Sequence, residues 1–202
     1  MNPYERWVLP YLLDLAMRHK EITRYRAEVA PRASGTVLEI GMGSGLNLPY
    51  YRGATTRLLA LDPSVPLLRM AKARAKKVQF PVELMALAGE RIPLADHSID
   101  AVVMTWTLCS IADPAKALAE IRRVLKPSGR LLFAEHGRAP DDRIATWQRR
   151  LNPVWGPLAG GCHLDRKIDD LVRDAGFRFD DLRKGYARLP RVFGFMYVGS
   201  AY

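Results

Sequence analysis

The sequence predicts an α/β fold in which a mostly parallel sheet is covered by helices on both faces. Apolar, strand-like segments alternate with helix-like segments from residue 36 to residue 135. Such alternation is typical of βαβ units, whose crossover helices pack on both faces of a parallel sheet. A glycine-rich turn, Gly41–Gly45, follows the first strand-like segment, and Asp62 ends the second. Because ligands bind at the carboxyl ends of parallel strands, both features mark the expected ligand side.

Five strands are expected in this part of the chain. They are short apolar runs, and they span residues 36–40, 57–61, 82–86, 99–105 and 130–135. Two helices are expected between them. Ser64 is a suitable N-cap for a helix that runs to Lys77. Asp113 as N-cap and Pro114 as first helical residue predict a second helix, which the segment 126–129 (KPSG) ends.

The two ends of the chain show weaker patterns. Residues 4–29 are expected to form one helix ahead of the sheet. Residues 137–165 hold three prolines and a Gly-Gly pair, so we expect an irregular insertion with one short helix. A helix over 166–175 then leads to two strand-like runs, about 177–187 and 192–201, which suit a hairpin-like return.

The bulk composition excludes some classes of function. The net charge of +10 arises from 31 Lys and Arg against 21 Asp and Glu. The basic residues are spread along the chain, whereas nucleic-acid-binding proteins more often gather them in one patch, so no nucleic-acid partner is expected. The chain has two cysteines, no visible secretory signal and no apolar run of about 20 residues, which favours a cytoplasmic location.

The glycine-rich turn differs from the dinucleotide-binding fingerprint G-x-G-x-x-G. Gly41–Gly45 reads G-x-G-x-G, and Leu46 occupies the position of the third glycine in the fingerprint. Glu39 would repel a pyrophosphate, but it can accept hydrogen bonds from an amino group. Asp62 stands where an acidic residue binds ribose hydroxyls. A ribose with an ammonium group and no phosphate describes S-adenosylmethionine.

Residues 36–136 resemble the class I S-adenosylmethionine-dependent methyltransferases of the ubiquinone-methylase-like type. The resemblance rests on VLEIGMGSG, LLALDPS, LAGERIPLADHSIDAVVMTWTLCSI and EIRRVLKPSGRLLFAEH. It implies a Rossmann-like fold with a central, mostly parallel seven-stranded sheet, helices on both faces and an antiparallel last strand. It also implies S-adenosylmethionine as the cofactor.

The same resemblance implies a set of cofactor contacts. The carboxylate of Asp62 binds the ribose, residues around Gly89 frame the adenine, and the glycine-rich turn with the backbone near Thr105 holds the methionine moiety. The implied cofactor-binding residues are Glu39, Gly41, Gly43, Gly45, Asp62, Pro63, Gly89, Glu90, Thr105 and Leu108.

The methyl acceptor is indicated by a second resemblance. The segments TWTLCSI, AEH and WQRRLNPVWGPLAGGCHLDRKIDDLVRDAGF resemble the methyltransferase-like seven group, which methylates thiols. The expected partner is therefore a small, apolar acceptor, with a thiol favoured. A quinone precursor or a phospholipid amine is the alternative, and a nucleic-acid methyltransferase or a non-catalytic binding protein is less favoured. A thiol is partly ionised near neutral pH, so its methylation does not require a strong base.

Two histidines are the candidate catalytic residues. His136 ends the fifth strand on the ligand side, and His163 lies in the insertion. Either side chain could orient or deprotonate the acceptor, and a structural hydrogen bond is the alternative for both. Cys109 and Cys162 fit best as buried apolar groups. With His163 they lack the spacing of a zinc site, so no metal is expected.

The whole chain, 1–202, is interpreted as one methyltransferase domain with four parts. Residues 1–34 form a helical lid or a membrane-contact segment, and 35–137 the cofactor-binding core. Residues 138–165 form the acceptor-site insertion, and 166–202 the last helix and strand hairpin. The first part carries apolar residues at helical spacing followed by basic ones, which leaves peripheral membrane contact open. The sequence does not indicate the oligomeric state.

Overall fold

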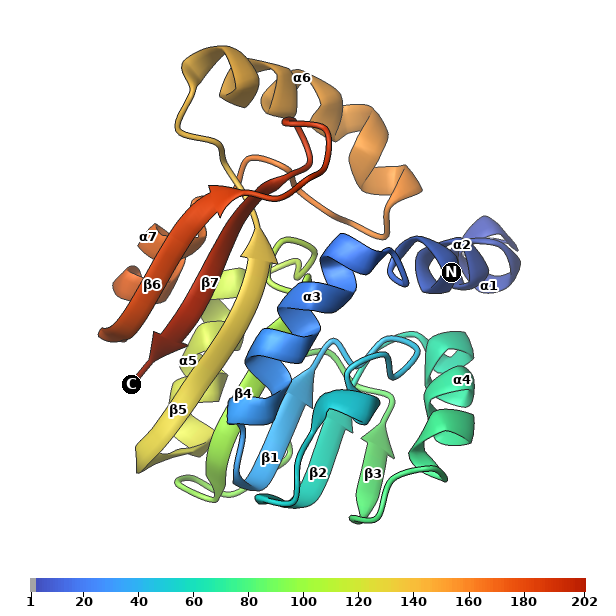
Figure 1. Cartoon of the computed structure of the whole chain (residues 1–202), viewed down its shortest axis with the longest axis vertical. Coiled ribbons are helices and arrows are strands. Elements are labelled where there is room, and N and C mark those ends of the chain that lie inside the picture. Colours follow the sequence, from blue (N-terminus) through green and yellow to red (C-terminus); the bar gives the residue numbers. More distant parts are fainter. Residues whose placement is uncertain (1–2) are drawn as a thin grey trace.

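The computed structural model describes residues 3–202 and contains a seven-stranded sheet with helices on both sides (Figure 1). The strands are ordered β3-β2-β1-β4-β5-β7-β6 across the sheet. Their bounds are β1 (Gly35–Ile40), β2 (Thr55–Leu61), β3 (Val82–Met85), β4 (Ile99–Thr105), β5 (Leu125–His136), β6 (Phe179–Tyr186) and β7 (Phe195–Ala201). Strand β7 pairs antiparallel with β5 and β6, and the other pairs are parallel. The predicted fold class is confirmed, including the antiparallel last strand.

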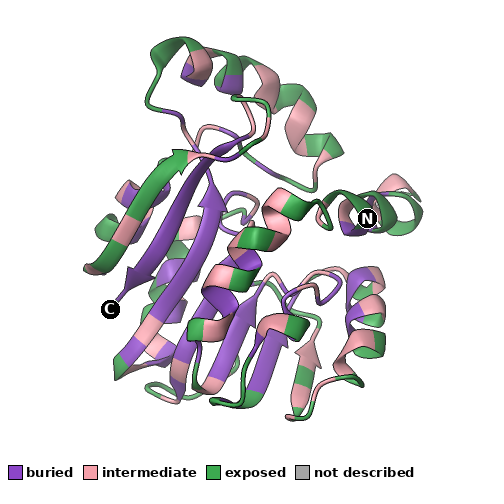
Figure 2. Cartoon of the chain, in the orientation of Figure 1, coloured by how far each residue is buried: buried purple, intermediate pink, exposed green. Residues whose placement is uncertain are grey.

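Over residues 3–202, seven α-helices surround this sheet, and four of them pack against its two faces. The α-helices are α1 (Pro3–Trp7), α2 (Leu9–Ala16), α3 (Lys20–Val29), α4 (Val65–Ala75), α5 (Pro114–Val124), α6 (Asp142–Leu158) and α7 (Ile168–Asp174), with short 3-10 helices η1 (Ala30–Arg32) and η2 (Leu48–Tyr50). Leu38 and Ile40 of β1 pack in one apolar layer with α5 and α7, whereas Val37 packs in the other with α3 and α4. The central strands are therefore buried, as Figure 2 shows.

Both helix N-caps proposed from the sequence are present. The Ser64 hydroxyl accepts a hydrogen bond from the backbone N–H of Leu67, and Asp113 Oδ1 accepts one from Lys116 over 3.0 Å. The helix α4 ends two residues earlier than Lys77. The turn expected over 126–129 is instead part of β5, where the pairing with β4 shifts register between Leu125 and Arg130.

The single helix expected over residues 4–29 is wrong, because this segment forms the three helices α1, α2 and α3. Pro10 lies in the first turn of α2, where a missing backbone N–H breaks no helical hydrogen bond. His19 has an extended backbone, and its Nδ1 accepts a hydrogen bond from the N–H of Glu21, so it caps a new helix. No helix within residues 3–202 is both long enough and apolar enough to cross a bilayer.

The short helix expected in the insertion is also wrong, because α6 is 17 residues long and contains Pro153 and Pro157. Asp141 caps its N-terminus by accepting hydrogen bonds from Arg143 and Ile144. Gln148 is almost completely buried and bonds to the backbone of the segments that precede α6 and β7. This anchor and the cap outweigh the hydrogen bonds that two prolines remove. In Figure 1, α6 lies beyond the carboxyl ends of the central strands.

Candidate active site

The predicted cofactor-binding residues and the catalytic candidate His136 lie on or after strands of the sheet. The strands β2, β1, β4 and β5 follow one another across the sheet in this order, and each pair is parallel. Their carboxyl ends therefore meet at one edge of the sheet. This edge brings together Gly41–Gly45, Asp62, Thr105–Leu108 and His136. Gly89 joins them, because its Cα faces the Ile40 side chain at the end of β1.

The glycine-rich turn is held close to the strand ends. Gly41 has φ +74°, and a Cβ on it would lie 2.1 Å from the Thr107 hydroxyl oxygen. The backbone N–H groups of Gly41 and Met42 both donate to the carbonyl of Leu61, at 2.9 and 3.0 Å. A side chain at residue 41 would therefore be both strained and sterically blocked.

Asp62 fixes the next part of the turn. Its Oδ2 accepts a hydrogen bond from the Gly43 N–H over 2.7 Å, and its Oδ1 accepts one from Ser64 over 2.8 Å. Burial raises the pKa of Asp62, and these two backbone hydrogen bonds oppose the rise. The carboxylate is thus rigidly oriented and still has lone pairs for a ribose diol. Pro63 follows it, exposed, at the start of the turn into α4.

Glu39 is completely buried beneath the turn. Its Oε1 accepts a hydrogen bond from Asn47 Nδ2 over 2.9 Å, and its Oε2 accepts one from the Tyr51 hydroxyl over 2.7 Å. Burial is the main reason that the pKa of Glu39 rises to about 7, although Tyr51, Arg26 and Asn47 lower it. Both oxygens have partners within the chain, so direct contact between Glu39 and a cofactor stays a prediction.

A buried arginine extends this network, and sequence reasoning missed it. Arg26 of α3 donates from Nη1 to Asn47 Oδ1 over 2.8 Å and to Thr105 Oγ1 over 3.2 Å. Asn47 also donates to Thr105 over 3.0 Å. Burial lowers the pKa of Arg26 to about 10, and the charge of Glu39 opposes that fall. The network joins α3 to the turn and to β4. Only the apolar neighbourhood of residue 26 in the helix could have indicated its burial.

Trp106 carries backbone strain next to this network. It follows β4 with φ +54°, a conformation that residues other than glycine rarely adopt. The guanidinium carbon of Arg26 lies 5.2 Å from the centre of the Trp106 ring, and Tyr25 meets the ring edge-on. The strain and these contacts set the direction in which the chain leaves β4 toward Leu108.

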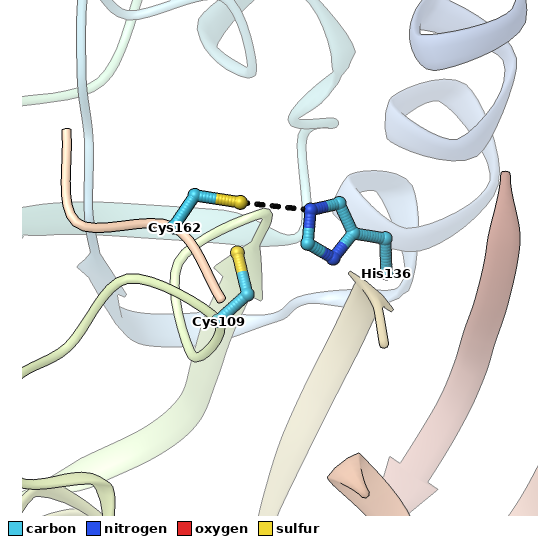
Figure 3. Close-up of side chains that lie close together, drawn as sticks. All are labelled: Cys109, His136 and Cys162. Atoms are coloured by element: carbon cyan, nitrogen blue, oxygen red, sulfur yellow. Dashed lines mark hydrogen bonds between the residues drawn. The ribbon is translucent and has the colours of Figure 1, made fainter. Parts of the chain in front are cut away.

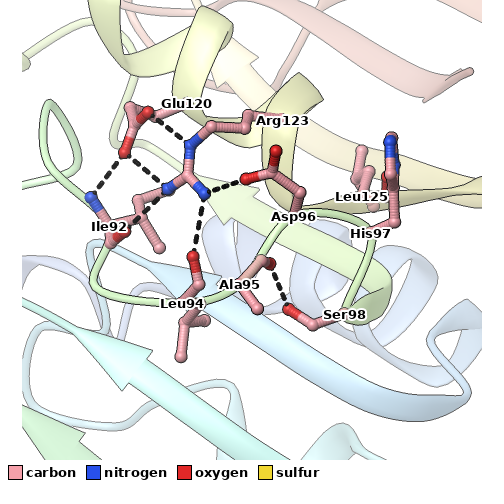
Figure 4. Close-up of polar contacts among 9 residues, drawn as sticks. All are labelled: Ile92, Leu94, Ala95, Asp96, His97, Ser98, Glu120, Arg123 and Leu125. Carbon is pink, nitrogen blue, oxygen red and sulfur yellow. Dashed lines mark hydrogen bonds and ion pairs between the residues drawn. The ribbon is translucent and has the colours of Figure 1, made fainter.

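The predicted adenine side is held by Arg123 of α5 (Figure 4). Its guanidinium donates to the carbonyls of Ile92 and Leu94, each over 2.8 Å, and to the carboxylates of Glu120 and Asp96. Glu120 also accepts a hydrogen bond from the Ile92 N–H over 2.9 Å. The hydrogen bond with Arg123 is the main reason that the pKa of Glu120 falls to about 2. This ion pair fixes the loop that follows Gly89 and Glu90.

The two adenine-side residues themselves differ in environment. Gly89 is buried, and a Cβ there would lie 2.9 Å from Ile40 Cγ2. Glu90 is half-buried, and its Oε1 accepts a hydrogen bond from the Asp113 N–H over 3.3 Å. The backbone at Gly89 can therefore be approached closely, whereas the Glu90 side chain also serves the start of α5.

His136 and the two cysteines lie close together at the carboxyl end of β5 (Figure 3). Nε2 of His136 lies 3.0 Å from Sγ of Cys162, and the Trp155 indole N–H donates to the same sulfur over 3.2 Å. Burial alone would lower the pKa of His136, but the hydrogen bond and charge of Cys162 raise it. The pKa of Cys162 is lowered, chiefly by the hydrogen bond from Cys109. His136 lowers it further, and burial opposes the fall.

His163, the second catalytic candidate, does not join this cluster. Its side chain is exposed, and its backbone N–H donates to the carbonyl of Cys109 over 2.8 Å. Apolar side chains surround the cysteines, chiefly Leu164, Trp155 and Phe193. The structure therefore places an imidazole and two sulfurs in an apolar environment at the same edge of the sheet as the glycine-rich turn. Whether either histidine is catalytic stays a prediction.

A cavity of about 420 Å³ lies between the first two helices and α4. Arg6, Trp7 and Tyr11 line one side, and Val65 and Met70 are on the other. The helix α4 starts at Val65, three residues after the predicted ribose-binding residue Asp62. The first two helices thus lie against α4, and the lid interpretation of residues 1–34 stays a prediction.

Comparisons with known proteins agree with this arrangement. Residues 38–133 match the family model described as a methyltransferase domain. The rat thiol S-methyltransferase TMT1B is 38% identical over 70% of this chain and 59% of its own length, so the chain spans about three fifths of that relative. Human thiol S-methyltransferase TMT1A is 30% identical over 94% of this chain and 82% of its own. The ubiquinone/menaquinone biosynthesis C-methyltransferase UbiE of Klebsiella pneumoniae is 32% identical over 81% and 76%.

The fold is also found in solved structures. A crystal structure of a SAM-dependent methyltransferase from Aquifex aeolicus superposes with a TM-score of 0.67 at 21% identity, covering 95% of this chain and 97% of the other. A likeness at this level of identity supports the fold alone. The assignment to a family rests on human TMT1A and on UbiE, each at least 30% identical and covered over more than two thirds of its length.

Proposed function

Since the chain belongs to the S-adenosylmethionine-dependent methyltransferases, we propose that it transfers a methyl group to the sulfur of a small, apolar thiol. The single observation that carries the thiol proposal is the similarity to relatives described as thiol S-methyltransferases. The apolar surroundings of His136 and the cysteines are compatible with such an acceptor. An apolar site with few polar groups is typical for small, greasy ligands.

The residues around the turn fit S-adenosylmethionine. The close packing of Gly41 leaves backbone rather than side chain at the turn, and Asp62 presents an oriented, buried carboxylate. Asp62 would hold the ribose, the backbone at Gly89 the adenine, and the turn with Thr105 the methionine moiety. When bound, the cofactor supplies a sulfonium methyl group that a nucleophile can displace.

The chain's own residues must then bind the acceptor, orient it and exclude water. His136 Nε2 is already engaged with Cys162, so His136 is poorly placed to act as a free general base. A thiol does not need one, because a few per cent of it is thiolate near neutral pH. The buried cysteines and the partly buried Trp155 give this region an apolar lining, and exclusion of water by such a lining favours displacement at the methyl group.

Methylation of a quinone precursor is the second candidate. The observation that favours it is the similarity to UbiE over most of both chains. A carbon or phenol acceptor depends more strongly on a general base than a thiol does. His136 would then have to release Cys162 and contact the acceptor.

Initial rates of tritiated methyl transfer over a panel of aryl thiols, alkyl thiols, quinols and amines test the proposal. We expect transfer to thiols, with a rate that rises with pH as the acceptor ionises and an apparent pKa that is lower for aryl thiols. Transfer to quinols alone, with one apparent pKa for every acceptor, would instead support the quinone alternative.

Peripheral membrane contact is a further part of the proposal. Trp7, Tyr11, Leu12 and Leu15 of the first two helices are each at least half exposed. Tyr4 bonds to the carbonyl of Leu158, which connects these helices to the exposed apolar end of α6. Together with nearby Arg and Lys side chains, such a surface suits the interface of an anionic membrane. An apolar acceptor would be concentrated in the same membrane.

A further inference from the structure

Cys109, His136 and Cys162 converge from three distant segments of the chain. Cys109 follows β4, His136 ends β5, and Cys162 lies in the turn after α6. One ligand atom from each residue lies within 4.8 Å of the other two, and all three residues are buried. Figure 3 shows both sulfurs directed toward the same side of the imidazole ring. Over residues 3–202, no further His, Cys, Asp or Glu belongs to this group.

We propose that these three side chains bind one Zn²⁺ ion and leave its fourth position open to the sulfur of the methyl acceptor. Thiolate sulfur and imidazole nitrogen are the donors that Zn²⁺ prefers, and three protein ligands with one open position are typical of catalytic rather than structural zinc. The metal-binding half of this proposal rests only on the cluster of Cys109, His136 and Cys162. The role of the open position rests on the proposed thiol methylation.

The separation of the His136 and Cys162 ligand atoms is close to that of a tetrahedral site. Zn–S and Zn–N bonds of about 2.3 and 2.0 Å place sulfur and nitrogen roughly 3.5 Å apart. Nε2 of His136 and Sγ of Cys162 are 3.0 Å apart, so they need to separate by only about half an ångström. The Trp155 N–H would continue to donate to the Cys162 sulfur, as hydrogen bonds to metal-bound thiolates commonly do.

The backbone around the ligands is already fixed. Glu135 is fully buried, and its carboxylate accepts hydrogen bonds from the N–H groups of Thr107 and Cys109. The Cys109 carbonyl accepts a hydrogen bond from His163, the residue after Cys162. These contacts hold the two cysteine-bearing loops against each other without using any of the three ligand atoms. Such support is expected around a preorganised metal site.

In the proposed reaction, protons are released when zinc binds and again when the acceptor thiol binds. Zinc binding releases two protons from the Cys109, His136 and Cys162 cluster to solvent. The acceptor thiol then takes the open position and releases its own proton. Its sulfur forms a bond to the methyl carbon while the bond between that carbon and the sulfonium breaks, which leaves a thioether and S-adenosylhomocysteine. The cluster lies at the same edge of the sheet as the glycine-rich turn, so acceptor and cofactor would meet at this edge.

The test begins with the full chain purified in reducing buffer, stripped with a chelator and dialysed against Zn²⁺. Elemental analysis should find one zinc per chain. Replacement with Co²⁺ should produce the near-ultraviolet charge-transfer band of cobalt–thiolate bonds. No bound metal, or a Cys109–Cys162 disulfide that persists in reducing buffer, would overturn the proposal. This experiment needs no variant, so it is independent of any effect of mutation on folding.

Variants then assign the ligands. Cys109→Ala, Cys162→Ala and His136→Gln should each weaken zinc binding at least about tenfold, the lower end of what even indirect perturbation of a metal site causes. The matched control is His163→Gln, which should bind zinc as the wild type does. Binding of S-adenosylhomocysteine by calorimetry confirms that each variant is folded. Loss of zinc from His163→Gln but not from His136→Gln would overturn the assigned ligand set.

Activity separates the two halves of the proposal. Thiol methylation that falls on zinc removal and returns with Zn²⁺ supports the open-position role. Zinc binding without thiol methylation would keep the metal site and refute the proposed function. Unchanged thiol methylation by the metal-free chain would refute the metal's role and leave the proposed function intact.

Discussion

The backbone N–H of Gly43 lies 2.7 Å from Oδ2 of Asp62, so one hydrogen bond joins the glycine-rich turn after β1 to the acidic end of β2. The two residues follow adjacent parallel strands, and the pairing of Ile40 with Leu61 brings them close together. The carboxylate therefore orients the turn and is itself oriented by it. A ligand that contacts both the turn and the Asp62 carboxylate therefore depends in part on this hydrogen bond.

Asp62→Ala should weaken the binding of S-adenosylmethionine at least tenfold, or about 1.4 kcal/mol, because charge-assisted hydrogen bonds to the ribose are lost. Isothermal titration calorimetry measures the change. Asp142→Ala is the matched control, since the Asp142 side chain is 95% exposed. Equal affinities for wild type and Asp62→Ala would refute the ribose assignment.

Arg123→Ala should lower the free energy of unfolding by about 1–3 kcal/mol, since the Ile92 carbonyl and Glu120 lose a charged partner. It should also weaken cofactor binding, because the loop after Gly89 would no longer be fixed. Urea unfolding and calorimetry give the two values. Arg122→Ala is the control: Arg122 bonds to the carbonyl of Gly176 instead, and its loss should leave cofactor affinity unchanged.

Glu39→Gln should change the pH dependence of stability. The pKa of Glu39 is about 7 in the folded chain and near 4.5 when exposed, so the folded state holds the extra proton between these values. Wild-type stability should therefore fall relative to the variant as pH rises from 4.5 to 7, by at most about 3 kcal/mol. Below and above this window the difference should be constant. A pH-independent difference would show that folding does not shift the pKa of Glu39.

Leu12→Ser with Leu15→Ser should reduce binding to anionic liposomes, because about half or more of each leucine is exposed. Activity on water-soluble thiols should stay near that of the wild type. Vesicle sedimentation measures the binding, and Val154→Ser on α6 shows whether the contact extends to that helix. A truncation before residue 29 is less suitable, because it removes Arg26 from its bonds to Asn47 and Thr105.

Local features of the sequence predicted the fold and the cofactor side well. Local residue patterns identify the N-caps Ser64 and Asp113 and the strand β4, because each depends only on residues near it in the sequence. The breaks between the first three helices and the length of α6 were not predicted. The positions of the prolines did not reveal that Gln148 anchors α6 to the neighbouring backbone or that His19 starts a new helix.

The buried networks could not be predicted from spacing. Arg26 and Thr105 are 79 positions apart, and their contact requires the final packing of α3 on the sheet. The two cysteines lack the local pattern of a zinc motif, and they meet His136 only because loops after β4 and α6 fold onto the end of β5. The site residues that local patterns do indicate, such as Asp62, are those next to a strand end or turn.

The central claim is that the methyl group is transferred to sulfur. The most direct test gives the enzyme an aryl acceptor that carries a thiol and a hydroxyl on the same ring, with S-adenosylmethionine labelled by carbon-13 in its methyl group. The two acceptor atoms then compete within one molecule at one concentration. Carbon NMR of the product identifies the atom that receives the label. We predict the label on sulfur, and a label on oxygen or on a ring carbon would contradict the account.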